Sequence, residues 1–269
     1  MNRHAGTARE RELRVVLAQL AAAPRDLRAN ATTIRDVLAG HPDAELAVFP
    51  ELFLCGYTGE RVAELALTLD DPLLAELATA CAESGTALAF GFAERGERGE
   101  RDASYPDSAV HNALAIIDAE GRLAAVYRKR LLFGAEAEAF VAGTDDVLGT
   151  AAGTAIGALI CFDIEFPEPA RRLALAGAEL LVSVAANMAP YLPDHELASR
   201  ARALDNRLPH VYVNAVGEAE GLRFVGGSRA VRADGSVALE LGAGEEVAEA
   251  RLTVGAAVDP AVDYLRFLR

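Results

Sequence analysis

The sequence predicts an α/β protein with two mixed sheets covered by helices. Short apolar runs, typical of buried strands, alternate with segments of helical periodicity, and several strand pairs are joined by turn residues. Residues 44–48 and 178–182 also repeat one pattern, Ala-Glu-Leu followed by apolar residues, as two related halves would. Since no linker divides the chain, we expect one domain over residues 1–269, with a polar leader at 1–12 and a C-terminal strand and tail at 242–269.

The first half of the chain alternates strand and helix candidates. Asp26 is a suitable cap for a helix that ends at Gly40, and Asp71-Pro72 begins another that ends at Gly85. The buried strands predicted around these helices are 13–20, 44–49 and 87–92.

The second half begins with a charged surface loop at 94–107 and a hairpin about the turn 118–121. Pro167 opens a predicted helix, and a second helix runs over 195–206 with Asp194 as its cap. The strands predicted here are 110–117, 122–127, 155–160, 180–185, 211–215, a hairpin within 226–241, and an edge strand at 246–254.

Composition narrows the function classes. Hydrophobic residues make up 52% of the 269 residues and charged residues 25%, which is typical of an enzyme with a large core. The formal net charge of −14 argues against nucleic acid or an anionic membrane surface as partner. The leader is too charged for a signal peptide, and the odd set Cys55, Cys81 and Cys161 suggests no disulfide framework. We therefore expect a cytoplasmic protein without membrane segments.

Cys161 is the first candidate for chemistry. It ends the apolar run 155–160 and stands before the helix that Pro167 opens, where backbone N–H groups can face a developing negative charge. The same field is expected to lower the pKa of the thiol and raise its thiolate fraction. Most cysteines are simply small buried residues, so this stretch alone leaves both interpretations open.

A nucleophilic thiol needs a proton acceptor. None of the five histidines follows a strand end in a turn, and His195 in particular is expected to open a surface helix. Glu51 follows a buried strand in apolar surroundings, where desolvation raises a carboxyl pKa and a partner is needed. Lys129 is the natural partner, although Arg128, Lys129 and Arg130 could equally be one solvated basic run.

Together these residues resemble a known family. Glu51 in Phe-Pro-Glu-Leu, Lys129 in Tyr-Arg-Lys and Cys161 in Ile-Cys-Phe-Asp-Ile-Glu-Phe-Pro-Glu are similar, in order and spacing, to the nitrilase (carbon–nitrogen hydrolase) superfamily. The resemblance implies a four-layer α-β-β-α sandwich, a Glu-Lys-Cys triad, no cofactor or metal, and pairing into a homodimer or larger homo-oligomer through helices. The segments after Glu51 and Cys161 look closest to the aliphatic amidase branch.

The resemblance also implies a second glutamate before the Phe-Val-Ala-Gly that ends at Gly143. Glu136 matches best, with Glu138 as the rival. The family often has histidine where this chain has Leu131, which puts local loop packing in doubt more than the reaction. The expected reaction is hydrolysis of a small carboxamide through a cysteine thioester, with Phe162 supplying a backbone N–H to the oxyanion.

Aromatic and polar residues near the predicted strand ends could line the substrate pocket. They are Tyr57, Phe133, Phe162, Asn187, Met188 and Tyr191. Glu165 is expected as a helix N-terminal charge rather than a pocket residue. Alternative functions are a nitrilase, an N-carbamoyl amidohydrolase using Arg171 or Arg172 as a carboxylate clamp, and a non-catalytic binding protein. A metal hydrolase is disfavoured because no His/Asp/Glu cluster has ligand spacing.

Overall fold

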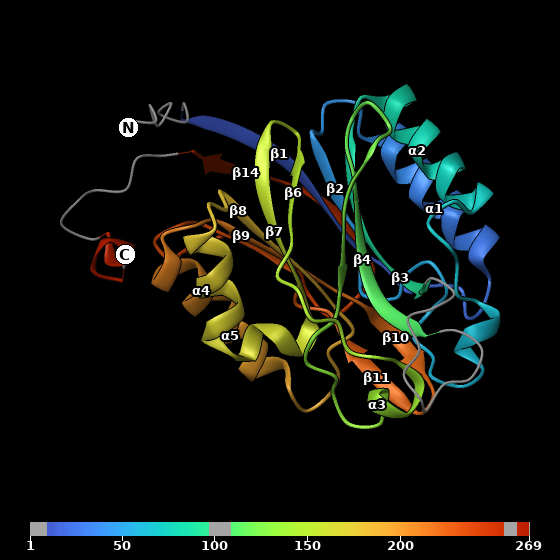
Figure 1. Cartoon of the computed structure of the whole chain (residues 1–269). Helices are drawn as coiled ribbons and strands as arrows, with labels where there is room; N and C mark the ends of the chain where they lie inside the picture. The colour runs from blue at the N-terminus through green and yellow to red at the C-terminus, as the bar shows by residue number, and fades with distance from the viewer. Residues whose placement is uncertain (1–9, 97–108, 256–262, 269) are drawn as a thin grey trace.

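Two six-stranded sheets face each other in the computed structural model, which describes residues 10–96, 109–255 and 263–268. A pair of helices covers the outer face of each sheet, so the chain forms four layers (Figure 1). Both sheets mix parallel and antiparallel strands. The predicted α-β-β-α sandwich with two mixed sheets is therefore confirmed.

The first sheet is parallel at its centre and antiparallel at its edges. β1, β2 and β3 run parallel, while β14 pairs with β1 and the β4–β5 hairpin follows β3 in antiparallel register. In spatial order its strands are β14 (Glu246–Val254), β1 (Arg11–Gln19), β2 (Leu46–Val48), β3 (Ala87–Arg95), β4 (Val110–Ile117) and β5 (Leu123–Arg128).

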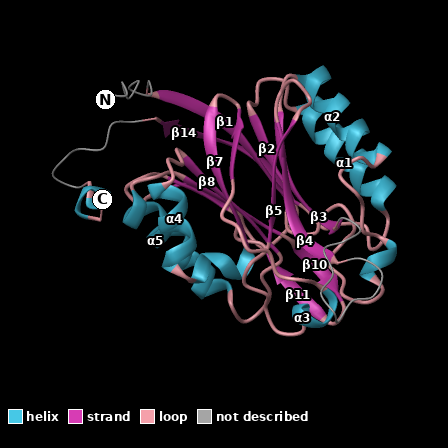
Figure 2. Cartoon of the chain, viewed as in Figure 1, coloured by secondary structure: helices cyan, strands magenta, loops and turns pink. Residues whose placement is uncertain are grey.

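The second sheet has the same plan. β7, β8 and β9 run parallel, with antiparallel strands on either side. Its strands in order are β13 (Val237–Glu240), β12 (Arg229–Val231), β9 (His210–Asn214), β8 (Leu180–Ala185), β7 (Thr154–Ile160) and β6 (Leu148–Ala151). A separate hairpin of β10 (Val216–Ala219) and β11 (Leu222–Val225) lies at one end of the sandwich, near α3 (Glu136–Ala139) (Figure 2).

Side-chain alternation along β1 explains the layers. Leu13, Val15 and Leu17 point into the core between the sheets, whereas Val16 and Ala18 point outward to a second core under the helices. A strand buried on both faces must be apolar throughout, which is why these strands lack the alternation of a half-exposed sheet.

Four longer helices cover the sheets. α1 (Leu27–Gly40) and α2 (Pro72–Ser84) pack on the first sheet, and α4 (Pro167–Leu175) and α5 (Leu192–Asn206) on the second (Figure 1). Asp26 and Asp71 cap α1 and α2 as predicted, by accepting hydrogen bonds from the backbone N–H groups of Ala29 and Leu73. Short helical turns are η1 (Val62–Glu64), α3 (Glu136–Ala139), η2 (Cys161–Glu165) and η3 (Tyr264–Phe267).

Several boundaries differ from the predictions. α5 begins at Leu192, so Asp194 lies in its first turn and is not its cap. Arg11 and Glu12, assigned to the polar leader, pair with β14. The predicted loop 94–107 begins inside β3, which runs to Arg95, and residues 97–108 lie outside the described part. β6, the β10–β11 hairpin and α3 were not predicted.

Gly91 on β3 fixes the turn that follows β2. Its N–H donates to Pro50 O and its carbonyl accepts from Leu54 N, so the turn that carries Glu51 is bonded to both sides of the glycine. A Cβ at position 91 would lie 2.2 Å from Leu52 N and 2.6 Å from Glu51 Cα. Only glycine lets the two backbones approach so closely.

None of the described helices is long and apolar enough to cross a membrane.

Candidate active site

Strand ends from both sheets meet at one end of the sandwich. Glu51 lies in the turn after β2, Lys129 directly follows β5, and Cys161 directly follows β7. Ala186, directly after β8, donates its N–H to Glu51 Oε2 at 2.8 Å and also interacts with the Cys161 thiol. This backbone N–H therefore links the carboxylate to the sulfur.

Glu51 and Lys129 form the predicted ion pair. Lys129 Nζ lies 2.7 Å from Glu51 Oε1, and both side chains have no exposed surface. Asn112 on β4 donates a further hydrogen bond of 2.7 Å to the same oxygen. A buried carboxylate with three donors is held in one position, which is what a proton acceptor in a reaction requires.

Glu136 completes a buried cluster of one cation and two carboxylates. Its carboxylate lies 2.8 Å from Lys129 Nζ, accepts a hydrogen bond from Phe133 N and accepts another from the Tyr57 hydroxyl at 3.1 Å. Glu138, two residues along α3, is exposed to solvent. Of the two candidates for the second glutamate, the structure thus brings Glu136 to Lys129.

Arg128, Lys129 and Arg130 do not form one solvated basic run, because each of them pairs with a different carboxylate. Arg128 pairs with Glu94 on β3 at 2.8 Å, and Arg130 pairs with Asp146. Lys129 alone turns inward.

The electrostatics hold Lys129 charged. Burial disfavours the ammonium, but the carboxylates of Glu51 and Glu136 outweigh it, so the pKa of Lys129 is raised well above its ordinary value. Burial also raises the pKa of Glu136, with Lys129 opposing the shift.

Cys161 differs from the prediction in its ionisation. Its backbone has φ 47°, a strained value for a non-glycine residue at the sharp turn from β7 into η2. Burial, and then the negative charge of Glu51, raise the pKa of the thiol well above its ordinary value, although Lys129 opposes the shift. The expected lowering of this pKa is therefore wrong. The sulfur is held as a thiol beside a carboxylate that can take its proton.

Asp163 fixes this turn, a role that was not predicted although the residue lies within the motif around Cys161. One oxygen accepts from Ile160 N at 2.9 Å and from the Tyr127 hydroxyl at 2.7 Å, and the other from Leu131 N at 3.1 Å. The carboxyl is fully buried, and burial raises its pKa. It ties the Cys161 turn to the segment that carries Lys129.

A narrow cavity of about 10 Å³ reaches Cys161, enough for about one water molecule. All the pocket residues expected from the sequence line it. The full lining is Tyr57, Phe133, Glu136, Cys161, Phe162, Glu165, Ala186, Asn187, Met188, Tyr191 and His195. A wider cavity of about 320 Å³ shares Tyr57, Phe133, Glu136 and Met188 with it.

Two expectations about this lining are wrong. His195 was assigned to a surface helix, but α5 begins three residues earlier and turns its imidazole inward, where it is 1% exposed. Glu165 was assigned as a helix N-terminal charge, but it lines the cavity with one oxygen 3.2 Å from His195 Nε2.

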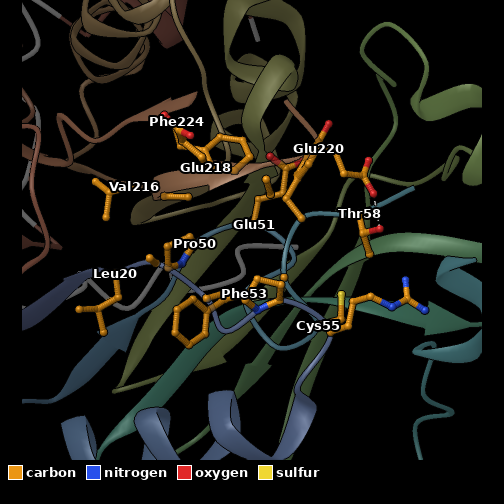
Figure 3. Close-up of a pocket in the computed structure, with 18 of the residues that line it drawn as sticks. Leu20, Pro50, Glu51, Phe53, Cys55, Thr58, Val216, Glu218, Glu220 and Phe224 are labelled. Atoms are coloured by element: carbon orange, nitrogen blue, oxygen red, sulfur yellow. Dashed lines mark hydrogen bonds between the residues drawn. The ribbon is translucent and has the colours of Figure 1, made fainter. Parts of the chain in front are cut away.

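Another cavity, of about 400 Å³, is lined by Glu51 but not by Cys161 (Figure 3). Figure 3 shows Glu51 between Phe53 and Phe224, which belong to opposite walls. The rings of Tyr57 and Phe224 pack edge to face at 5.4 Å, and both line this cavity. Chemistry at the sulfur therefore belongs to the narrow cavity, despite its smaller volume.

Within the described ranges, no three His, Cys, Asp or Glu residues are grouped so that they could hold a metal ion. What the arrangement offers instead is a protonated thiol, a fixed carboxylate and a permanent ammonium in water-poor surroundings. These are the parts of a nucleophilic displacement at an electrophilic carbon.

Comparison with known proteins gives a consistent result. The carbon–nitrogen hydrolase family model matches residues 14–259. A Pseudomonas protegens protein described as a hydrolase in the pqqF 5′ region is 40% identical over 228 residues, covering 83% of this chain and 77% of that protein. An (R)-stereoselective amidase from a Pseudomonas species is 35% identical over 259 residues, covering 94% and 90%.

A solved structure adds chemical information. A mutant amidase from Nesterenkonia sp. AN1, with the acetamide moiety of fluoroacetamide added covalently at its active-site cysteine, superposes with a TM-score of 0.79. It is 27% identical, and the alignment covers 97% of this chain and 94% of that one.

Proposed function

The chain belongs to the carbon–nitrogen hydrolase family, and from that premise we propose that it hydrolyses a small carboxamide to a carboxylate and ammonia through a thioester on Cys161. Enzymes of this class act on non-peptide C–N bonds, and the resemblance to its amidase branch is borne out by the relatives. The observation that carries the proposal is the buried pairing of Glu51 with Lys129 beside a protonated thiol.

Acylation begins when the Cys161 sulfur attacks the amide carbon and its proton passes to Glu51. The carbonyl oxygen becomes an oxyanion, which the Lys129 ammonium and the Phe162 backbone N–H stabilise. When the intermediate collapses, the C–N bond breaks, Glu51 returns the proton to nitrogen, and ammonia leaves. Because the thiol is not pre-ionised, proton transfer and attack are coupled, which is the role of a general base.

Deacylation uses the same carboxylate. Water attacks the thioester carbon while Glu51 takes its proton, the C–S bond breaks, and the proton returns to sulfur. Glu136 orients the substrate amide, since it is held by Lys129, Phe133 N and Tyr57. The narrow cavity at the sulfur favours small acyl groups.

The test is Cys161→Ala. We expect it to abolish ammonia release from acetamide and propionamide while the melting temperature stays near that of the wild type. Intact-protein mass spectrometry of the wild type, quenched during turnover, should show an acyl adduct on Cys161. The matched control is Cys81→Ala, a buried cysteine in α2 away from the site, which should keep its activity. Equal rates for the wild type and Cys161→Ala would contradict the mechanism.

The alternatives are distinguished by the same assay. Nitriles could react with the same thiol, and ammonia release from a nitrile but from no amide would favour a nitrilase. The N-carbamoyl alternative loses support, because neither Arg171 nor Arg172 lines the cavity at Cys161 and Arg172 pairs with Asp146. A non-catalytic protein would release no ammonia from any of these compounds.

A further inference from the structure

We infer that the Cys161 pocket selects amides whose acyl group carries an ammonium close to the carbonyl, with Glu165 as the residue that determines this specificity. The inference rests on the proposed function, because it names the substrate class of that same site. It is carried by the position of Glu165, the hydrogen bonds that hold its carboxylate, and the absence of lysine and arginine from the described pocket lining.

Glu165 presents its charge to the pocket. It ends the η2 turn that begins at Cys161, and it lines the same narrow cavity. Its side chain is 30% exposed, whereas His195, its partner at 3.2 Å, is almost fully buried. The carboxylate is therefore anchored on one side and open on the other.

A chain of hydrogen bonds orients the His195 ring toward Glu165. Burial raises the pKa of Tyr212 well above its ordinary value, so the phenol keeps its proton, and it accepts a hydrogen bond from the Asn187 side chain. The Tyr212 hydroxyl lies 2.8 Å from His195 Nδ1 and can donate to it. With that hydrogen bond at Nδ1, the proton on Nε2 points at Glu165, 3.2 Å away, and holds the carboxylate by a hydrogen bond.

The rest of the lining suits a cation. Phe133 packs edge to face with Phe162 at 5.3 Å and with Tyr191 at 5.7 Å, and aromatic faces attract ammonium groups. No lysine or arginine lines this cavity, and the nearby Lys129 is already matched by Glu51 and Glu136.

The test compares three amides of similar size. Glycinamide and propionamide differ only in an ammonium for a methyl group, and malonamate carries a negative charge instead. At about pH 6.5, where the glycinamide amine is protonated, we expect wild-type kcat/KM to be about tenfold or more higher for glycinamide than for propionamide. Malonamate should be the slowest, and added salt should reduce the preference for glycinamide.

The decisive variant is Glu165→Gln, which keeps the shape and removes the charge. We expect the ratio of kcat/KM for glycinamide to that for propionamide to fall to about one. The matched control is Glu168→Gln, an exposed glutamate three residues along the chain and outside the cavity, which should keep the wild-type ratio. Because the readout is a ratio within one variant, a general loss of folded enzyme does not change it.

The outcomes separate the two proposals. If the wild type hydrolyses both amides equally well, or if Glu165→Gln keeps the preference, the specificity inference is overturned and the amidase function stands. If the wild type hydrolyses neither amide and Cys161 acquires no adduct, the proposed function falls, and this inference with it.

Discussion

Lys129 is surrounded by more negative charge than it can neutralise alone. Among the residues that the structure describes, it is the one cation paired with Glu51 and Glu136, and all three side chains are at least nine-tenths buried. Buried ion pairs of this kind contribute little net stability, because desolvation offsets the attraction, but breaking one leaves an uncompensated charge. The cluster is therefore explained by chemistry rather than by stability.

Replacing Lys129 by Met should accordingly destabilise the fold. We expect the free energy of unfolding, measured by urea denaturation at about neutral pH, to fall by about 3–5 kcal/mol, because two carboxylates lose their counter-ion. The loss should shrink at acid pH, where the carboxylates accept protons. Arg130→Met is the control: Arg130 is 28% exposed and pairs with Asp146 at the surface, so its loss should cost at most about 1 kcal/mol. Similar losses for the two variants would refute the argument.

At the residue scale, the sequence predicted the candidate catalytic residues better than it predicted their hydrogen-bond partners and ionisation. Order and spacing pointed to Glu51, Lys129 and Cys161, because each follows a strand that is readable as apolar. The roles of Asn112 and Asp163 were not predicted, since a polar residue in a strand or turn is interpreted as exposed until its partners are known. The pKa of Cys161 was predicted with the wrong sign, because the burial of the thiol and the approach of Glu51 are three-dimensional facts.

Elements that pack by apolar periodicity were predictable, and elements fixed by neighbours were not. β6 has four residues and no apolar run of its own, and it forms by pairing with β7. The β10–β11 hairpin contains Glu218 and Glu220, residues of low strand propensity, and reads as a loop. The start of α5 was missed because Asp194 was interpreted as its cap, and the same error hid the buried position of His195.

His210 shows how α5 is fixed to the second sheet. On β9, its ring nitrogens lie 2.6 Å from Ser183 Oγ on β8 and 2.9 Å from the Ser199 carbonyl on α5. Burial lowers the pKa of His210 from 6.5 to about 4. This histidine joins three elements and stays neutral while it does so.

A dependence of stability on pH follows from this shift. Between pH 6.5 and about 4 the unfolded chain binds a proton at His210 that the folded chain does not bind, so stability is lost as the pH falls through this window. We expect this histidine to contribute as much as about 3 kcal/mol to the loss. In His210→Gln the slope of unfolding free energy against pH should be smaller over this range. His41→Gln, at the end of α1, should keep the wild-type slope, and an unchanged slope in both variants would rule the contribution out.

At the scale of the whole molecule, the repeated Ala-Glu-Leu pattern marks equivalent positions in two halves. β2 and β8 are each the middle strand of a parallel triplet. Glu45, just before β2, accepts a hydrogen bond of 2.9 Å from Arg14 N on the adjacent strand β1. Glu179, just before β8, accepts one of the same length from Ala155 N on the adjacent strand β7. A five-residue similarity in the sequence thus predicted the pseudo-symmetry of the sandwich.

The outer face of α5 leads us to expect a homodimer. Leu197 and Leu204 lie on one stripe of the helix, seven residues apart, and are 72% and 39% exposed. Light scattering should give twice the 28.3 kDa of one chain. Leu197→Glu should shift the mass toward one chain, whereas Leu123→Glu, on the edge strand β5, should not. A single-chain mass for the wild type would disprove the pairing.

The separate fates of Arg128, Lys129 and Arg130 have one practical consequence. Trypsin cleaves after each of these residues, yet Lys129 is buried against Glu51 and Glu136, and its neighbours are paired with Glu94 and Asp146. A protease can bind this segment only after these ion pairs have separated. The appearance of fragments cut here would therefore report the opening of this end of the sandwich.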